Sequence, residues 1–545
     1  MLGDAGKRQN VVELLRKETE GNVFFLVEVV RALADDAGSL HDIGRRTLPD
    51  HVFTGGVYQV IQQRLDHIPP SMQYILKTAA IAGRYIDTDI LRAALPDADI
   101  DNWLNQSLNA AVLDVHEQRW RFAHEKLREA VSMTIPRDEA VAIHERVALA
   151  IEHIYPNNDD YAEVLLNHWR ETGNGEKERH YTLRALEQMA RRGRGFDVIQ
   201  LGKRLLELIE KDDTYHQALI YTRIGRAYRY ISDYERAIEY LGYALENAFE
   251  PKFFDLVAMI INEMGDIFRL QGKYYRAEGF YKAALEYAHD MNAKQQVALA
   301  LFNLGQVHRL QGNYDVAIKT ALDSLLLSQE LNDRAAVAKT QAEIGFLAFM
   351  KGEAEDMVEG NIKAAIQYYE SVGNDLDASS YLSNLGMIMW SRGKFSDAVP
   401  YLRQALKTKI QLGDRWNVAS IHNTLGYVYT GLDDNDAAED HFNNALVIAW
   451  DIQAESLLLD IIAGIAQLYV KGKHYDNALR LLGLALHHPA SNSDVRHAVD
   501  SVLDTMKDAV SAEKIQAGLA HGENLDFNAV IWELLRDANP SAETA

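Results

Sequence analysis

A small residue recurs about every forty positions through the second half of the chain. Gly or Ala stands at Gly225, Gly265, Gly305, Gly345, Gly386, Gly426 and Ala466, and one interval is 41 residues instead of 40. A residue of this size lets two helices approach closely, because a larger side chain would hold their backbones apart. A repeat of this length in several copies predicts an array in which each unit packs mainly against its neighbours.

Three further columns follow the small residue in the same register. Two are mostly alanine: Ala237, Ala277, Ala317, Ala398, Ala438 and Ala478, and then Ala244, Ala284, Ser324, Ala405, Ala445 and Ala485. The column between them is mostly apolar and contains Tyr240, Phe280, Thr320, Tyr401, Phe442 and Leu482. Turn residues precede these columns at Gly272, Gly312 and Gly393, where glycine can adopt the left-handed conformation that ends a helix. Each unit is therefore predicted to be a helix–turn–helix hairpin.

These columns resemble the tetratricopeptide (TPR) repeat, in a longer form of about 40 residues, over residues 215–490. The resemblance implies an α-solenoid of seven to eight units. The copy at Gly345 matches least well, because Glu353 and Ala354 stand where the aromatic residue is expected. We also expect capping helices and a polar tail in residues 491–545.

The first 200 residues lack this period. The segment from Thr19 to Leu26 (TEGNVFFL) resembles the helical lid that follows the nucleotide-binding core of STAND ATPases (signal-transduction ATPases with numerous domains). The segments 58–95 and 103–122 resemble the winged helix of the same architecture, with a hairpin at 112–122. The resemblance implies a lid remnant in residues 1–50, a winged-helix domain in 51–136 and a helical connector with a degenerate first repeat in 137–214. The predicted fold is thus mostly α, a lid remnant and a winged helix followed by a TPR-like solenoid.

The sequence contains no recognisable catalytic or cofactor motif. Its one candidate for a phosphate-binding loop, residues 3–8, lacks the required spacing, has Arg8 where a hydroxyl must ligand magnesium, and follows no strand. There is no cysteine, which excludes thiolate chemistry and Cys-ligated zinc. His124, at the end of the wing, is predicted to be a structural hydrogen-bonding residue. We therefore expect no enzymatic activity, no cofactor and no metal.

Charge and hydropathy restrict the partners. Lys and Arg number 56 and Asp and Glu 79, so the net charge of −23 disfavours nucleic acid. The predicted groove-reading helix supports this, because residues 93–118 contain neither Lys nor Arg. The first ten residues have no apolar core, and the longest apolar stretch, 457–470, is too short to span a bilayer and contains Asp460. We expect a cytoplasmic protein without a membrane partner.

The binding surface is expected on the inner face of the first helix of each repeat. Positions three before, one after and four after the small column point in similar directions on a helix. The candidate partner-binding residues are Arg226, Arg229, Asn262, Arg269, Gln306, Arg309, Phe349, Asn384, Trp390, Asn423 and Tyr427. If Arg229, Arg269 and Arg309 are uncompensated, they favour an acidic, extended segment anchored against Phe349 and Trp390. The alternative is a solvated face on which these arginines pair with Glu263 or Asp266.

Three functions are consistent with this sequence. The first is a non-catalytic scaffold that binds a peptide or protein, as the sensor arm of a STAND-type signalling protein whose ATPase core acts in cis or in trans. The second is a free-standing TPR adaptor. The third is a winged-helix transcription regulator, which the acidic groove-reading helix disfavours.

Overall fold

The computed structural model describes residues 57–249, 253–352 and 355–538, together with residues 11–13, 26 and 30. The predicted lid segment 19–26 and the candidate phosphate-binding loop lie almost entirely outside the described residues. The chain divides into two compact units between Ala185 and Leu186. Within the described residues, no helix combines the length and apolar character needed to cross a membrane.

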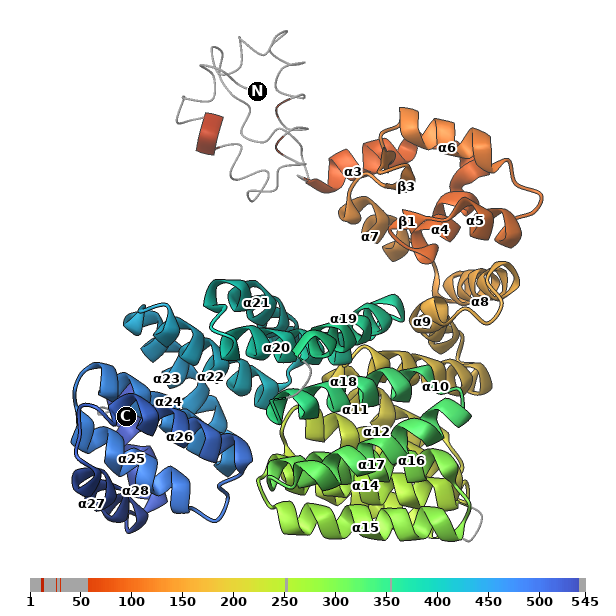
Figure 1. The fold of residues 1–545 in the computed structure, drawn as a ribbon. Helices are drawn as coiled ribbons and strands as arrows, with labels where there is room; N and C mark the ends of the chain where they lie inside the picture. The colour runs from red at the N-terminus through yellow and green to blue at the C-terminus, as the bar shows by residue number, and fades with distance from the viewer. Residues whose placement is uncertain are drawn as a thin grey trace. The chain divides into compact units, whose positions relative to one another are not determined.

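The first unit contains a small sheet among helices (Figure 1). Its elements are α3 (Val57–Asp66), α4 (Gln73–Ala82), β1 (Tyr85–Ile86), α5 (Thr88–Ala94), α6 (Ile100–Asn109), β2 (Leu113–His116), β3 (Arg119–Phe122), α7 (Glu125–Met133), α8 (Arg137–Ile154), α9 (Ala162–Thr172) and α10 (Gly175–Arg191), with short 3-10 helices at Pro70–Met72 and Asp159–Tyr161. The strands are antiparallel in the order β1-β3-β2, so the wing hairpin lies beside the short first strand. This order of helices and strands is that of a winged helix, as the sequence predicts.

Local chemistry explains the boundaries of these elements. Asp87 and Asp99 cap α5 and α6, because each carboxylate accepts hydrogen bonds from free backbone N–H groups of the first turn. His124 caps α7, and its Nδ1 accepts a hydrogen bond from the backbone N–H of Lys126 at 3.1 Å. The prediction that His124 is a structural hydrogen-bonding residue is therefore confirmed.

The second unit consists of helical hairpins stacked in sequence order (Figure 1). The hairpins pair α12 (Thr214–Tyr230) with α13 (Tyr234–Ala248), α14 (Phe254–Leu270) with α15 (Tyr274–Asp290), α16 (Lys294–Leu310) with α17 (Tyr314–Glu330), α18 (Arg334–Met350) with α19 (Glu355–Ser371), α20 (Asp375–Ser391) with α21 (Phe395–Leu412), α22 (Arg415–Gly431) with α23 (Asn435–Asp451), and α24 (Glu455–Lys471) with α25 (Tyr475–His487). Helix α11 (Gly195–Leu208) precedes them. Helices α26 (Ser493–Met506), α27 (Ala512–Glu523) and α28 (Phe527–Ala538) follow them. The predicted solenoid is confirmed, including a hairpin at the weakly matching fourth copy.

The turns inside the hairpins have the predicted geometry. Gly272, Gly312 and Gly393 have φ angles between 71° and 84°, in the left-handed region that favours glycine. Ser232 and Asp433 occupy the same turn position in two other repeats, with φ of 63° and 61°. The turn is thus a property of the repeat, and glycine is its commonest solution.

The small column marks the crossing point of the two helices in each hairpin. A Cβ atom added to Gly386 would lie 2.5 Å from Leu402, and one added to Gly426 would lie 2.5 Å from Phe442. Gly225 and Gly265 face Leu241 and Tyr281 in the same way, sixteen residues later in the sequence. No larger side chain fits without moving a helix.

The apolar column of the sequence pattern only partly coincides with the side chains that meet the small column. Phe442 belongs to both, and Thr320 Oγ1 lies 3.1 Å from a Cβ atom added to Gly305. In three other repeats the contact is made by the residue after the column member, which is Leu241, Tyr281 or Leu402.

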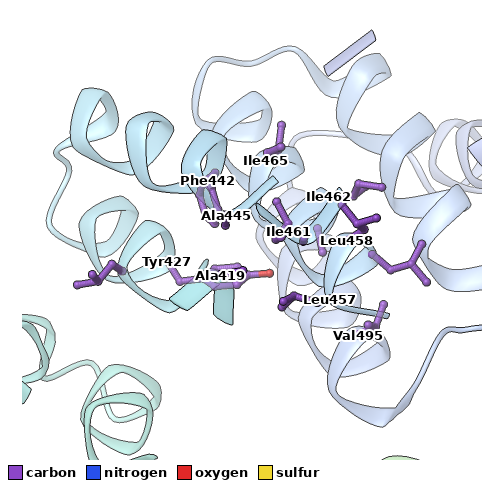
Figure 2. Close-up of a cluster of buried hydrophobic side chains, with 14 of the residues drawn as sticks. Ala419, Tyr427, Phe442, Ala445, Leu457, Leu458, Ile461, Ile462, Ile465 and Val495 are labelled. Carbon is purple, nitrogen blue, oxygen red and sulfur yellow. The ribbon is translucent and has the colours of Figure 1, made fainter. Parts of the chain in front are cut away.

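The largest hydrophobic cluster fills the C-terminal repeats. Phe442, from α23, lies between Gly426 of α22 and Gly464 of α24, and its ring occupies the space that both glycines leave free. Figure 2 shows this ring above Ala445, with Leu458 and Ile461 of α24 beside it. Tyr427 extends from α22 towards α24. This core joins successive repeats through side chains that are almost completely excluded from solvent.

Residues far apart in the sequence also meet along one edge of the array. The Tyr274 hydroxyl donates to Ser456 Oγ at 2.9 Å, and Asn492 Nδ2 donates to the same two oxygens at 2.8 and 2.7 Å. Gly193 packs against Leu412, more than two hundred residues later. The start of α15 thus lies against the starts of α24 and α26, and the turn before α11 lies against the end of α21, which closes one turn of the coil upon the next.

Candidate functional site

The first helices of the repeats form the inner side of the array. Helix α14 contacts both α12 and α16, and α22 contacts both α20 and α24, so first helices touch directly from one repeat to the next. In a curved stack the helices that lie closest together are on the concave side. We call the side chains on this side the inner face: residues at positions −6, −3, −2, +1 and +4 relative to the small column.

The arginines at the start of the inner face are paired within the chain. Arg226 Nη2 lies 2.5 Å from Glu263 Oε1, and Arg229 Nε lies 3.1 Å from Glu263 Oε2. Asp266 lies between Arg229 and Arg269, at 3.8 and 3.6 Å. Burial disfavours the charge of Asp266, but the two arginines outweigh this effect and lower its pKa. The cluster thus joins two arginines of α12 to two acids and one arginine of α14.

The third predicted arginine is paired across the closed edge. Arg309 Nη1 lies 3.0 Å from Asp494 Oδ2, and Arg309 Nε lies 3.4 Å from Glu343 Oε1. Burial alone would lower the pKa of Arg309, but Asp494 and Glu343 outweigh it and raise that pKa. The premise that Arg229, Arg269 and Arg309 are uncompensated is therefore wrong, because each forms an ion pair with an acidic side chain, which for Arg269 is Asp266 of its own helix.

The predicted asparagines differ in their surroundings. Asn262 is 1% exposed; its Nδ2 donates to Ala258 O at 3.1 Å and its Oδ1 accepts from Asn303 Nδ2 at 3.3 Å. Asn423 is 2% exposed, and its Nδ2 donates to Asp460 Oδ2 at 2.7 Å. Asn384 and Gln306 are half-buried on α20 and α16.

The predicted aromatic anchors lie in the middle of the inner face. Phe349 and Trp390 are half-buried and pack against the large hydrophobic cluster. The ring centroid of Trp390 lies 5.1 Å from that of Tyr427, and Tyr427 in turn contacts Phe442 edge to face at 5.4 Å. These rings connect the inner face to the core, so a ligand that contacts Trp390 would touch a rigid surface.

Asp460 is an acidic side chain that the sequence analysis did not include in the site. It lies half-buried on the inner face of α24 and accepts hydrogen bonds from Asn423 Nδ2 and, at 3.1 Å, from the Tyr427 hydroxyl. Burial and the nearby charge of Asp494 raise its pKa to about 7, although both hydrogen bonds oppose the shift. In the sequence, the sign of this site was a lone acid inside the apolar stretch 457–470. That acid served above only as an argument against a membrane span.

A second missed group is a completely buried ion pair. Lys409 is 1% exposed, and its ammonium donates to Asp414 Oδ2 at 3.0 Å, to Leu376 O at 2.9 Å and to Ser380 Oγ at 2.8 Å. All three of its donors are satisfied, so the group joins α20, α21 and the start of α22 instead of facing a ligand.

A pocket also opens beside α17, α18 and α19. Its lining includes Gln329, Arg334, Gln341 and Tyr368, none of which is a predicted site residue. It is separate from the arginine and aromatic residues of the inner face.

Comparison with known proteins identifies the repeats. Family models described as tetratricopeptide repeat match residues 218–250, 256–330 and 379–412. No curated protein matches the sequence.

Several solved structures resemble the chain. One is a Rap protein complexed with competence and sporulation factor, at 14% identity and a TM-score of 0.46, covering 67% of this chain and 100% of that one. Another is a STAND protein with a tetratricopeptide repeat sensor from Pyrococcus horikoshii, at 15% identity and 0.40, covering 93% and 73%. A third is NprR in complex with its cognate peptide NprX, at 16% identity and 0.41, covering 59% and 97%. At sequence identities this low, the likeness to these structures concerns the fold alone. The sequence matches and the stacked hairpins together show that this chain contains tetratricopeptide repeats.

Proposed function

We propose that the chain is a scaffold that binds an extended peptide or protein segment along the inner face of its repeats. The observation that carries this proposal is the concentration of polar, charged and aromatic side chains on first helices of successive repeats. Hairpin packing needs small and apolar residues at the crossing points, and the inner-face residues lie outside those points. A repeated polar face with rigid aromatic residues supplies both hydrogen bonds and an anchor for a ligand.

The ion pairs define what such a ligand must do. Because Glu263, Asp266 and Asp494 already neutralise the arginines, an acidic ligand gains a salt bridge only by displacing one of these carboxylates. Asp494 is the most exposed of the three, at 39%, and is the one most easily exchanged. An acidic contact is therefore proposed at Arg309, and the apolar anchor remains proposed at Phe349 and Trp390.

We propose further that this scaffold is the sensor arm of a STAND-type signalling protein. Support comes from the order of the chain, in which a winged helix precedes the repeats, and from the lid-like segment 19–26. A free-standing adaptor is the alternative. The reading frame immediately upstream of the Met1 codon, or beside it, tests this: a phosphate-loop ATPase encoded there supports the proposal, and unrelated neighbours contradict it.

Selection from a random peptide library tests the binding proposal. The full chain is immobilised, and peptides are selected on the wild type, on Trp390→Ala and on Tyr275→Ala. Tyr275 is the matched control because it is an aromatic residue, 89% exposed, on the second helix α15. The proposal expects peptides whose affinity falls at least about tenfold with Trp390→Ala, as for an aromatic anchor, and is unchanged with Tyr275→Ala. Peptides that ignore Trp390 and lose affinity with Tyr275→Ala would place the site on the outer face.

A further inference from the structure

Asp460 is an acid that borders the large hydrophobic cluster. It lies on α24 within a helix whose neighbours Leu457, Leu458 and Ile461 are buried in the large cluster. Its side chain turns to the inner face, where Asn423 and Tyr427 of the preceding repeat contact it at 2.7 and 3.1 Å. A carboxylate placed there costs free energy unless a partner compensates it.

The other carboxylates of this region have cationic partners. Asp266 has Arg229 and Arg269, Asp494 has Arg309, and Asp414 has Lys409. Among the residues that the structure describes, no Lys or Arg forms an ion pair with Asp460, and the charge of another acid, Asp494, acts on it. Asp460 thus differs from the three paired acids.

A hydrogen-bond acceptor without a donor lies beside Asp460. Asn423 Oδ1 has no hydrogen-bond partner in the described part of the chain, although this side chain is 2% exposed. Nδ2 of the same amide donates to Asp460, so the unpartnered oxygen belongs to a side chain that is held against this acid. A buried acceptor without a donor is unfavourable. Among the described residues, the pair thus combines a carboxylate without a cationic partner and an amide oxygen without a donor.

We propose that Asp460 and Asn423 form a subsite for a cationic group of the bound segment, an ammonium or a guanidinium. This inference rests on the proposed function and adds to it the chemistry of one ligand position. Such a group carries several N–H donors and a positive charge, so it satisfies the amide oxygen and compensates the carboxylate at once. An organic cation fits better than a metal ion, because the described residues hold no group of three or more metal-binding side chains.

The ionisation of Asp460 provides an independent readout. Its pKa is raised to about 7, so it is partly protonated at neutral pH. A bound cation favours the carboxylate form and lowers that pKa. Binding at pH 7 must then release a fraction of a proton, which calorimetry detects as a heat that changes with the ionisation enthalpy of the buffer.

The peptide selection tests the subsite on the full chain with two variants. Asp460→Asn keeps the shape of the side chain, and Asp440→Asn is the matched control, an exposed acid on the second helix of the preceding repeat. We expect peptides selected on the wild type and on Asp440→Asn to share a basic residue or a free amino terminus at one position. Replacing the basic residue by norleucine, or acetylating the amino terminus, distinguishes these two sources. Whichever of these two changes removes the bound cation should weaken peptide binding to the wild type about tenfold or more. The same change should alter binding to Asp460→Asn by no more than about twofold.

Each outcome decides a different claim. Selected peptides with no basic preference, or with the same loss on Asp460→Asn as on the wild type, overturn the subsite and leave the proposed function standing. If no peptide is enriched on any variant, the proposed function fails and the subsite fails with it. Proton release on wild-type binding at pH 7 supports the subsite without a variant, so misfolding of Asp460→Asn would not leave it undecided, and an absence of release contradicts it.

Discussion

Arg309 and Asp494 are separated by 185 residues in the sequence, and their side chains lie 3.0 Å apart. The backbone carbonyl of Arg309 also accepts a hydrogen bond from Ser493 Oγ at 2.9 Å. The start of α26 is therefore attached to the end of α16, and a residue that the sequence places among candidate ligand contacts is part of the closure of the coil. An acidic ligand at Arg309, as proposed above, would compete with Asp494 for one guanidinium.

Replacing Asp494 by Asn should loosen this closure. The charge-assisted contact is lost, while the neighbouring hydrogen bonds of Asn492 remain. Because the chain has no cysteine, spin labels can be attached to Asn313→Cys and Arg496→Cys, two exposed positions on either side of the contact. We expect a narrow distance distribution in the wild type and a broader one, with longer distances, in the variant.

The control for this measurement is Asp315→Asn, which removes an ion pair between α17 and Lys351, the residue that follows α18. Asp315 is 91% exposed, and such pairs contribute little, so the distance distribution should not change. If Asp494→Asn also leaves the distance distribution unchanged, other contacts hold α26 against α16.

Substitutions at the helix crossings should depend on the space at each glycine. Gly386→Ala would bring its Cβ 2.5 Å from Leu402, and overpacking of this kind costs about 1–3 kcal/mol. Gly242→Ala is the control, since nothing lies within 4 Å of its Cβ position and alanine favours the helix by about 0.5–1 kcal/mol. Thermal unfolding followed by circular dichroism should show a lower midpoint for the first variant and an equal or higher one for the second. Equal effects of the two substitutions would mean that the small column does not mark a helix crossing.

Lys409→Met should destabilise the chain strongly. The substitution leaves the buried carboxylate of Asp414 without its cation, and breaking a buried pair in this way costs about 3–5 kcal/mol. Lys407→Met, an exposed neighbour on the same helix, should cost less than about 0.5 kcal/mol. Hydrogen exchange should show faster opening of α20, α21 and α22 in Lys409→Met alone. Unchanged protection in this variant would show that the pair does not hold the three helices together.

Asp460 makes stability depend on pH. Its pKa is raised from 3.8 to about 7 in the folded chain, so the folded state binds a proton more tightly than the unfolded state. This contribution to stability is present below pH 4 and is lost as the pH rises to about 7. The variant Asp460→Asn has no group that titrates at this position. The difference between its free energy of unfolding and that of the wild type should therefore rise by about 1–4 kcal/mol between pH 5 and pH 8. Parallel pH profiles in urea unfolding would contradict the raised pKa.

Mg-ATP should not bind to this chain. The sequence offers no glycine-rich loop with the spacing that cradles phosphates, and Arg8 stands where a magnesium-ligating hydroxyl is needed. Isothermal titration should give no binding heat, with a phosphate-loop ATPase as the positive control. Micromolar affinity would contradict this prediction.

The repeat fold was predictable because its constraints are local. A forty-residue spacing of small residues and the turn glycines are both visible in the sequence, and both follow from close helix packing. Which of the two adjacent side chains Phe280 and Tyr281 packs into the helix crossing cannot be assigned by pattern alone, because both are aromatic.

The site was harder to predict because it depends on contacts between repeats. The inner position of Arg229, Arg269 and Arg309 follows from helical periodicity, but their partners depend on curvature and on the closing of the coil. Glu263 and Asp266 lie one repeat after Arg229, on the helix that carries Arg269, and were recognisable as alternatives. Asp494 lies nearly two hundred residues away, and no sequence period connects it to Arg309.

The binding proposal is tested most directly by photo-cross-linking a selected peptide to the full chain. The peptide carries a benzophenone at its central position, and mass spectrometry locates the adducts. The account predicts adducts on the first helices α16, α18, α20 and α22, close to Arg309, Phe349, Trp390 and Asn423. Adducts confined to the second helices, such as α15, α17 and α21, or to the winged-helix unit, would contradict it.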